Sequence, residues 1–468
     1  MARRLFSITI IYLITIAAYS QNTWVKIYGN GESDEGLDVQ QTADGGYIII
    51  GKTYSLSTGS ADDIYMVKVN SIGNIIFSKT WGGLEDDKGR CVQQTSDYGY
   101  MIIGSTRSFG AGYEDLYLIK TDENGDTLWT RTYGGELSET GYSGQQTIDG
   151  GYIITGYTMG GGILIKTNSL GDTLWTRMFI EEVLDHSYDI QQTNDKGYIL
   201  IGKAGGLAAL VKTDSLGQLL WARYFGAKRL DRGYSVDQTL DGGYVITGIQ
   251  YIPGGSESES CVFLIKTDAS GDTLWTRKLG DNHSAGNCVR KTVDGGYVIT
   301  GYEDMDYISL IKTDALGNPV WDRKFDYGEG QAVRQTRDGG YIVTGSQNYD
   351  LFLMKTDDAG NVTGIEDKKS SNQKLIYAFN LYQNYPNPFN ESTQIVYQIS
   401  ETVPVKIMLY DLLGRQVRTL VNRPLNAGIH EIQWNGKDKS GHSLPSGIYF
   451  CQLLAGDKRQ TIKVLMAK

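Results

Sequence analysis

One short segment recurs seven times along the chain and constrains its fold more than any other feature. Its first copy reads Asp44-Gly45-Gly46-Tyr47-Ile48-Ile49-Ile50-Gly51. The tyrosine of this segment stands at positions 47, 100, 152, 198, 244, 297 and 341, so successive copies are 53, 52, 46, 46, 53 and 44 residues apart. A second motif follows each copy, with a lysine at 68, 120, 166, 212, 266, 312 and 355. The chain therefore contains seven repeats of one supersecondary unit.

Each repeat is long enough for four short strands. In the second repeat the pattern predicts strands at 90–95, 99–105, 115–121 and 127–133, joined by turns rich in glycine and aspartate. Apolar runs such as Tyr152-Ile153-Ile154 fit strands that are covered on both faces. Repeats of this period are typical of propellers, so we expect an all-β, seven-bladed β-propeller over residues 22–363. A parallel β-helix is the alternative, although its coils are usually shorter than these repeats.

The two ends of the repeat region complement each other. Six repeats place an aromatic residue nine positions after the motif lysine, whereas the seventh has Gly364 there. The segment 23–28 resembles the missing strand, because Trp24 precedes a tyrosine by four residues, as Trp129 does in the second repeat. We therefore expect this N-terminal strand to complete the last blade, whose first three strands come from residues 331–357. Such closure leaves no sheet edge open.

Composition and motifs exclude several function classes. The chain has 44 basic and 54 acidic side chains, a formal charge of -10 and no basic stripe, which argues against nucleic acid as a partner. No phosphate-binding loop, nucleophile elbow or HExxH helix occurs, so the sequence favours a protein that is not an enzyme and has no cofactor. Residues that recur in nearly every repeat are expected to be structural. The four histidines lack metal-ligand spacing, and they are His186, His283, His430 and His442.

The N-terminus reads as an export signal. Arg3 and Arg4 precede an apolar run from Leu5 to Ala18, and Ala18-Tyr19-Ser20 places small residues where a signal peptidase cuts. We expect residues 1–20 to be a signal peptide that is removed. No other apolar run is long enough to cross a bilayer, so no transmembrane span is expected after signal removal. Export permits disulfides, but Cys91 and Cys288 fall in repeats that are not neighbours, and we expect free, buried thiols.

The composition changes after the repeats. A polar linker is expected at 364–375, and alternating apolar residues after it predict a small β-sandwich over residues 376–468. This part contains Asn384-Tyr385-Pro386-Asn387-Pro388-Phe389-Asn390, then Leu409-Tyr410-Asp411-Leu412-Leu413-Gly414-Arg415, then Leu444-Pro445-Ser446-Gly447-Ile448-Tyr449-Phe450. In this order the motifs resemble the type A C-terminal sorting domain of type IX secretion.

That resemblance implies an Ig-like fold and an export route. It implies entry into the periplasm of a Gram-negative bacterium, recognition by the type IX secretion machinery, and delivery to the cell surface or the medium. The residues that match the family's hallmark stretches are Tyr385, Pro386, Asn387, Pro388, Phe389, Gly447, Ile448 and Tyr449. A related Ig-like module occurs in flagellar hook-capping proteins, and the N-terminal signal favours the sorting role over that setting.

Variation in repeat length indicates where a ligand would bind. The distance from the motif tyrosine to the motif lysine varies from 14 to 22 residues, so the variable loops lie between the second and third strands. Variable loops on a rigid scaffold tend to carry binding sites. The long loops supply Tyr54, Phe109, Tyr113 and Tyr251, and the connections between repeats on the same rim add carboxylates such as Asp34, Glu35 and Asp86. This mixture suits a glycan or cell-surface ligand, with calcium as the alternative.

Two functions follow from these expectations. The first is a secreted or cell-surface, non-enzymatic binding and adhesion protein. The second is a secreted carbohydrate-active enzyme, a glycoside hydrolase or lyase whose carboxylates come from several repeats. The absence of a singular catalytic motif favours the first.

Overall fold

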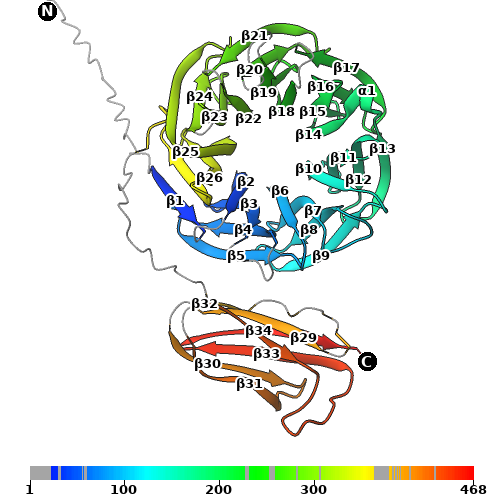
Figure 1. Ribbon diagram of the computed structural model, residues 1–468, viewed down its shortest axis with the longest axis vertical. Coiled ribbons are helices and arrows are strands. Elements are labelled where there is room, and N and C mark those ends of the chain that lie inside the picture. The colour runs from blue at the N-terminus through cyan, green and yellow to red at the C-terminus, as the bar shows by residue number, and fades with distance from the viewer. Residues whose placement is uncertain are drawn as a thin grey trace, which may run out of the picture. The chain divides into compact units, whose positions relative to one another are not determined.

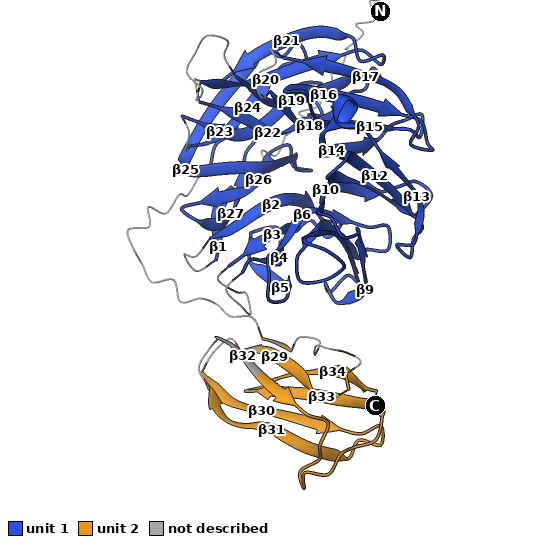
Figure 2. Ribbon diagram, turned by 45° about the vertical axis from the view of Figure 1, so that its right-hand side comes forward, with its two compact units in different colours: residues 1–366 blue, residues 367–468 orange. Residues whose placement is uncertain are grey.

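The computed structural model divides the chain into two compact units, residues 1–366 and residues 367–468 (Figure 2). It describes residues 23–362, except 30–32, 55, 57–60, 227–230, 252–258, 281–282 and 305–306, and residues 379–467, except 382–383, 385–386, 388, 391, 400–401 and 426–427. The expected signal peptide (1–20) and linker (364–375) lie outside the described residues. Across the described part of the chain, no helix has the length and apolar character needed to span a membrane.

The first unit consists almost entirely of strands. Its described residues include one short helix, α1 (Glu181–Leu184), between β13 and β14. The strands are β1 (Trp24–Tyr28), β2 (Asp34–Gln41), β3 (Tyr47–Thr53), β4 (Asp63–Val69), β5 (Ile75–Trp81), β6 (Asp87–Gln94), β7 (Tyr100–Thr106), β8 (Asp115–Thr121), β9 (Thr127–Tyr133), β10 (Glu139–Gln146), β11 (Tyr152–Thr158), β12 (Gly161–Thr167), β13 (Thr173–Met178), β14 (His186–Gln192), β15 (Tyr198–Ala204), β16 (Leu207–Thr213), β17 (Leu219–Phe225), β18 (Arg232–Gln238), β19 (Tyr244–Tyr251), β20 (Ser260–Thr267), β21 (Thr273–Leu279), β22 (Ala285–Lys291), β23 (Tyr297–Glu303), β24 (Tyr307–Thr313), β25 (Pro319–Gln335), β26 (Tyr341–Gln347) and β27 (Asp350–Thr356).

These strands form antiparallel sheets arranged around a central opening (Figure 1). The four-stranded sheets are β2-β3-β4-β5, β6-β7-β8-β9, β10-β11-β12-β13, β14-β15-β16-β17 and β18-β19-β20-β21, and a seven-stranded sheet has the order β1-β27-β26-β25-β24-β23-β22. The first strand of each four-stranded sheet lies nearest the opening and the fourth lies outermost. We call the first the inner strand. The antiparallel pairing excludes the parallel β-helix.

The last two repeats differ from the expectation of two separate sheets. β25 is 17 residues long and pairs with β24 through its first half and with β26 through its second half. The chain stays extended through Tyr327 and Gly328, whereas residues 82–86 separate β5 from β6 in the first two repeats. A single strand is therefore the outer strand of one repeat and the inner strand of the next.

The N-terminal strand pairs with the last repeat, as the sequence predicts. β1 is antiparallel to β27, with a register that runs from Trp24 opposite Lys355 to Tyr28 opposite Leu351. The hydroxyl of Tyr28 donates a hydrogen bond to the carbonyl of Gly73 at 2.7 Å. The first segment of the chain thus contacts both the last repeat and the first.

One aromatic contact joins each pair of neighbouring repeats. The Trp129 ring of β9 lies 5.9 Å from the Tyr152 ring of β11, centroid to centroid. Gly171 lies beneath Trp129 with φ +80°, and a Cβ atom at this position would lie 2.7 Å from the indole ring. Only glycine combines that φ with so close an approach. The same contact occurs in seven pairs, Trp24–Tyr47, Phe77–Tyr100, Trp129–Tyr152, Trp175–Tyr198, Trp221–Tyr244, Trp275–Tyr297 and Trp321–Tyr341.

A buried lysine secures the turn within each repeat. Lys266 of β20 has a side chain that is 6% exposed, and its Nζ lies 2.8 Å from Asp241 in the turn between β18 and β19. The same ammonium donates to the carbonyl of Thr267 at 2.7 Å. Equivalent ion pairs occur in all seven repeats. A buried charge is tolerated only when it is paired and hydrogen-bonded, so this motif is structural.

The second unit contains two sheets packed around one apolar core. Its strands are β28 (Asn380–Leu381), β29 (Thr393–Ile399), β30 (Val403–Tyr410), β31 (Gln416–Leu425), β32 (Gly428–Trp434), β33 (Gly447–Ala455) and β34 (Lys458–Met466). The sheets have the orders β28-β29-β32 and β31-β30-β33-β34. Trp434 is fully buried and lies between the rings of Phe389 and Tyr449, at 5.2 and 5.4 Å. This is the expected Ig-like sandwich.

The role of β1 can be tested with matched substitutions on its two faces. Trp24 is 8% exposed and Ile27 is 36% exposed. Trp24→Ala should lower the free energy of unfolding by about 3–5 kcal/mol, because a large buried side chain is removed. Ile27→Ala should cost no more than about 1 kcal/mol. Equal losses in urea denaturation would mean that β1 does not complete the repeat array.

The lysine–aspartate turns predict acid sensitivity. Burial would raise the pKa of Asp241, but hydrogen bonds from Lys266, Thr239 and the Gly243 amide outweigh it and lower the pKa to about 2. Because the unfolded chain binds protons more readily in this range, the free energy of unfolding should fall as pH drops from about 4 to about 2. Urea denaturation across that range should show a smaller fall for Asp241→Asn. If the stability of Asp241→Asn fell with pH as much as that of the native chain, the ion pair of Asp241 with Lys266 would not contribute to the acid sensitivity.

Candidate functional site

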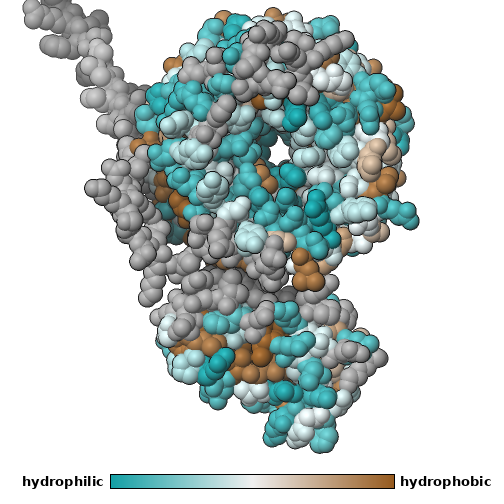
Figure 3. Space-filling view, viewed as in Figure 1, coloured by the Kyte–Doolittle hydropathy of each residue, from teal (hydrophilic) through white to brown (hydrophobic). Residues whose placement is uncertain are grey.

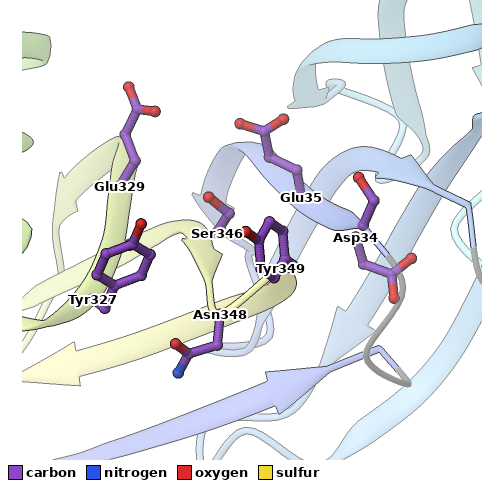
Figure 4. Close-up of a pocket in the computed structure, with 9 residues that line it drawn as sticks. Asp34, Glu35, Tyr327, Glu329, Ser346, Asn348 and Tyr349 are labelled. Carbon is purple, nitrogen blue, oxygen red and sulfur yellow. The ribbon is translucent and has the colours of Figure 1, made fainter. Parts of the chain in front are cut away.

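A pocket of about 220 Å³ lies where the first repeat meets the last. It is lined by Ser33, Asp34, Glu35, Tyr327, Gly328, Glu329, Ser346, Asn348 and Tyr349. Glu35 comes from β2 and Glu329 from β25, and Figure 4 shows the two side chains projecting in the same direction. Glu35 lies near the start of the inner strand β2, and Glu329 lies near the start of the part of β25 that pairs with β26. This is the end of the sheets at which the loops between second and third strands also lie. We call this pocket the channel mouth.

The two glutamates are held by amide side chains of neighbouring repeats. The Gln331 amide donates to the Glu35 carboxyl at 3.0 Å. The Asn287 amide donates to Glu329 at 2.7 Å and to the Gly330 carbonyl at 3.0 Å. These contacts join three repeats and fix the orientation of both carboxyl groups.

The surroundings of Glu35 and Glu329 disfavour the ionised form of both carboxyl groups. Burial raises the pKa of Glu35, against the charges of Lys52, Arg90 and Lys88. Burial also raises the pKa of Glu329, and the charge of Glu35 adds to this rise. The pKa values of both carboxyl groups in this pocket are therefore shifted in the same direction, above the ordinary value of glutamate.

The turn at the edge of the pocket is strained. Asn348 and Tyr349 both have positive φ, at 51° and 70°. Asparagine tolerates this conformation, whereas a bulky residue such as tyrosine rarely adopts it. The Tyr349 side chain is 72% exposed and its carbonyl accepts a hydrogen bond from the Asp34 amide at 2.7 Å. Strain of this kind gathers at functional sites.

Of the residues expected to bind a ligand, Asp34 and Glu35 line the channel mouth. Asp34 is nonetheless 1% exposed, and it accepts a hydrogen bond from the Thr53 hydroxyl at 2.5 Å. Its neighbour Glu35 offers the accessible carboxyl. Glu329 and Tyr349 were not expected. Tyr349 lies in a two-residue turn between β26 and β27, so the rule that long loops carry binding residues did not point to it. A tyrosine in so short a turn was nevertheless a usable sequence signal.

The other expected residues are spread over three repeats. Tyr54 and Tyr113 are exposed, at 41% and 81%. Phe109 packs on Tyr117 at 5.8 Å, and the Tyr251 amide donates to Asp231 at 2.8 Å. Asp86 accepts from the Asp62 amide and lies 3.6 Å from an arginine. The structure does not gather these side chains at the channel mouth, and their role in binding stays a prediction.

The described residues include no group of three or more carboxylate, histidine or cysteine side chains arranged to hold a metal ion. Calcium binding therefore also stays a prediction. All four cysteines are buried, and the Cys91 thiol donates to the Gly144 carbonyl at 3.3 Å.

The hallmark residues of the C-terminal unit support its last strand. The Asn387 side chain accepts a hydrogen bond from the Leu465 amide at 2.7 Å, and the Phe389 amide donates to the Leu465 carbonyl at 3.0 Å. Gly447 and Ile448 pair with Met466 and Leu465, and the Tyr449 hydroxyl donates to the Pro445 carbonyl at 2.7 Å. Both hallmark stretches thus meet at β34. Tyr385, Pro386 and Pro388 lie outside the described residues.

The raised pKa of Glu329 gives a test of the channel mouth. Because the folded chain resists ionisation of this carboxyl, its presence should cost more stability at pH 7 than at pH 4. Glu329→Gln should therefore stabilise the protein relative to the native chain more at pH 7 than at pH 4, as measured by urea denaturation. Glu136→Gln, at an exposed position, is the control and should change little. An identical effect of Glu329→Gln at both pH values would contradict this description.

Comparisons with known proteins identify one domain. The family described as FlgD Ig-like domain matches residues 389–457. No curated protein matches the chain. Two similar solved structures each have 11% identity and a TM-score of 0.45. One is PorZ, described as an essential bacterial surface component of the type-IX secretion system of Porphyromonas gingivalis, where the match covers 94% of this chain and 60% of that one. The other is Sqt1 from Chaetomium thermophilum, with 72% of this chain and 99% of that one covered.

Proposed function

We propose that the first unit is a seven-bladed β-propeller that is closed by β1 and binds a ligand at the channel mouth. The seven aromatic contacts between neighbouring repeats support the blade count. β25 then belongs to two blades, and the seven-stranded sheet is two blades that share it. The strand β1 supplies the outer strand of the last blade.

The observation that carries the binding role is the departure from the repeat at the channel mouth. Elsewhere the repeats reuse the same buried lysine and aromatic groups, which are scaffold. At the channel mouth two half-buried glutamates, held by amides from other blades, stand beside an exposed tyrosine in a strained turn. A singular polar pocket on a repetitive scaffold is the place where a ligand is most readily recognised.

The C-terminal unit is proposed to be a type A sorting domain. The ordered motifs in residues 376–468 support this role, and the match to an Ig-like family supports its fold. With a signal peptide at residues 1–20, the chain would enter the periplasm and leave it through the type IX secretion machinery. The protein then acts outside a Gram-negative bacterium, on the cell surface or in the medium.

A carbohydrate-active enzyme is the second candidate, and the glutamate pair favours it. Glycoside cleavage uses two carboxyl groups, one of which is protonated near neutral pH. Glu35 and Glu329 both have raised pKa values in one pocket. Incubation of the purified protein with a polysaccharide panel distinguishes the two functions, because an enzyme releases shortened products and a binding protein does not. Release that is lost in Glu35→Gln or Glu329→Gln would establish the enzyme.

Export can be tested by removing the proposed sorting domain. A chain that lacks residues 376–468 should accumulate in the periplasm of the native host, whereas the full chain should reach the surface or the medium. Cell fractionation and protease accessibility of intact cells measure this difference. Surface delivery of the truncated chain would remove the assigned role of the C-terminal unit.

A further inference from the structure

Each inner strand of the first unit contains a β-bulge, and the bulged residue is different in different repeats. In β10 the register shifts between Gly141 and Ser143, so Tyr142 has no partner on β11. Bulges re-aim side chains and are common beside functional sites. The seven bulged residues are Leu37, Arg90, Tyr142, Tyr188, Tyr234, Asn287 and Gln331.

Three consecutive repeats place a tyrosine at the bulge. The Tyr142 and Tyr188 rings lie 5.1 Å apart at an interplanar angle of 82°, and the Tyr188 and Tyr234 rings lie 5.4 Å apart at 58°. All three are partly exposed on strands that surround the opening seen in Figure 3. We call Tyr142, Tyr188 and Tyr234 the tyrosine arc. It is confined to one side of the opening, so it is not part of the repeated scaffold.

An arginine lies at each end of this arc. The Arg90 guanidinium lies over the Tyr142 ring, 4.7 Å from its centroid. Burial raises the pKa of Tyr234, and the charge of Arg232 and its hydrogen bond to this side chain oppose the rise. Burial also raises the pKa of Tyr142, and both Arg90 and Arg232 oppose it. The two guanidinium groups therefore act on the same tyrosine from different repeats.

Among the described residues neither arginine forms an ion pair with a carboxylate, although the charge of Arg90 acts on Glu35. The Nε atoms of Arg90 and Arg232 are buried and have no hydrogen-bond partner within the described part of the chain. By contrast, Arg290 and Arg334, later along their inner strands, pair with Asp189 at 3.5 Å and Asp38 at 3.0 Å. A buried donor without a protein partner is costly, so each of these two groups calls for a partner such as an ordered water or a ligand.

The opposite side of the opening has a different character. Glu35 and Glu329 stand there with the amides of Gln331 and Asn287, which can exchange hydrogen bonds with hydroxyl groups. Carboxyl groups on this side disfavour a densely charged polyanion such as nucleic acid. A ligand that fits both sides has an apolar ring face, several hydroxyls and one acid group.

We propose that the channel binds an anionic saccharide, with its carboxylate or sulfate on Arg90 and Arg232, a sugar face against the tyrosine arc, and hydroxyls toward Glu35 and Glu329. This inference rests on the proposed binding function and names its ligand class. Arginine is suited to planar acid groups because its donors form a fork, and tyrosine rings stack on the C–H faces of sugars.

Calorimetry with four matched oligosaccharides tests the ligand class. The probes are tetragalacturonate, a sulfated carrageenan tetrasaccharide, neutral cellotetraose and the cationic chitosan tetramer, each titrated into the purified mature full chain. At least one anionic probe should bind, at least about tenfold more tightly than cellotetraose, because charge-assisted hydrogen bonds are added. If only one of the two anionic probes binds more tightly than cellotetraose, its acid group, carboxylate or sulfate, is the one that the site recognises. Equal or tighter binding of the neutral or cationic probe would overturn the proposal.

Arginine variants test the site. Arg90→Gln and Arg232→Gln should each weaken the anionic probe by at least about tenfold and leave cellotetraose unchanged. The control is Arg131→Gln, because Arg131 also lies over an aromatic ring, at 5.4 Å from Trp129, but on an outer strand. It should bind like the native chain. The melting temperature of Arg90→Gln should stay the same or rise, since an unpaired buried donor is removed, whereas a purely structural arginine would lower it.

The outcomes separate this inference from the function on which it rests. Binding of a neutral saccharide that is weakened by Glu35→Gln but not by the arginine variants would leave the binding function and refute the anionic site. Anionic binding that both arginine variants leave intact would also refute it. The absence of binding by all four probes would refute the inference, while the proposed export and the binding of another class of ligand at the channel mouth are unaffected.

Discussion

The contact between an outer-strand aromatic ring and the next repeat is the interaction on which the first unit depends. Each ring packs against a tyrosine of the next sheet and lies over a glycine with positive φ, as Trp129 does with Tyr152 and Gly171. The array has a place for this ring at every junction, including the one between its two ends. Trp24 fills that place, where a Cβ on Gly73 would lie 2.8 Å from the indole. Because β1 is far in sequence from β27, the ends of the repeat region must meet before the array is complete.

The same repetition makes the unusual residues visible. Seven buried lysines are each paired with an aspartate, and Arg290 and Arg334 on the inner strands are paired with aspartates as well. Against this background the unpaired nitrogens of Arg90 and Arg232 and the glutamate pair at the channel mouth are exceptions. These side chains surround the opening and are not part of the repeated motifs, which makes them the candidates for ligand recognition.

Much of the fold could be predicted because the repeat is local. The motif period located the strands, and the match between segment 23–28 and the fourth strand of other repeats predicted the pairing of β1 with β27. The continuous strand β25 could not be predicted, because nothing in its residues distinguishes an extended connection from a turn. The first strand of the second repeat begins at Asp87, three residues before the predicted start. There the Asp87 amide donates a hydrogen bond to the Asp62 carbonyl of the neighbouring sheet.

The site was harder to predict than the fold. Loop length directed attention to Tyr113 and Tyr251, and the connections between repeats pointed to Glu35. Glu329 was missed, because it is distant from Glu35 in sequence and the two line one pocket only where the first repeat meets the last. Asp34 was expected to face a ligand, and it lines the channel mouth while its side chain accepts a hydrogen bond from Thr53. The bulges that aim the tyrosine arc depend on sheet register, which single-residue patterns do not reveal.

Hydrogen exchange of the backbone amides in β1 tests the central claim most directly. If β1 is the outer strand of the last repeat, its amides that bond to β27 should exchange as slowly as those of β5 and β9, the outer strands of other repeats. Mass spectrometry of peptides that cover residues 23–28 measures this in the full chain. Protection equal to that of β5 and β9 is the result predicted here. Exchange as fast as in an unstructured peptide, with β5 and β9 protected, would contradict the pairing and the closure that rests on it.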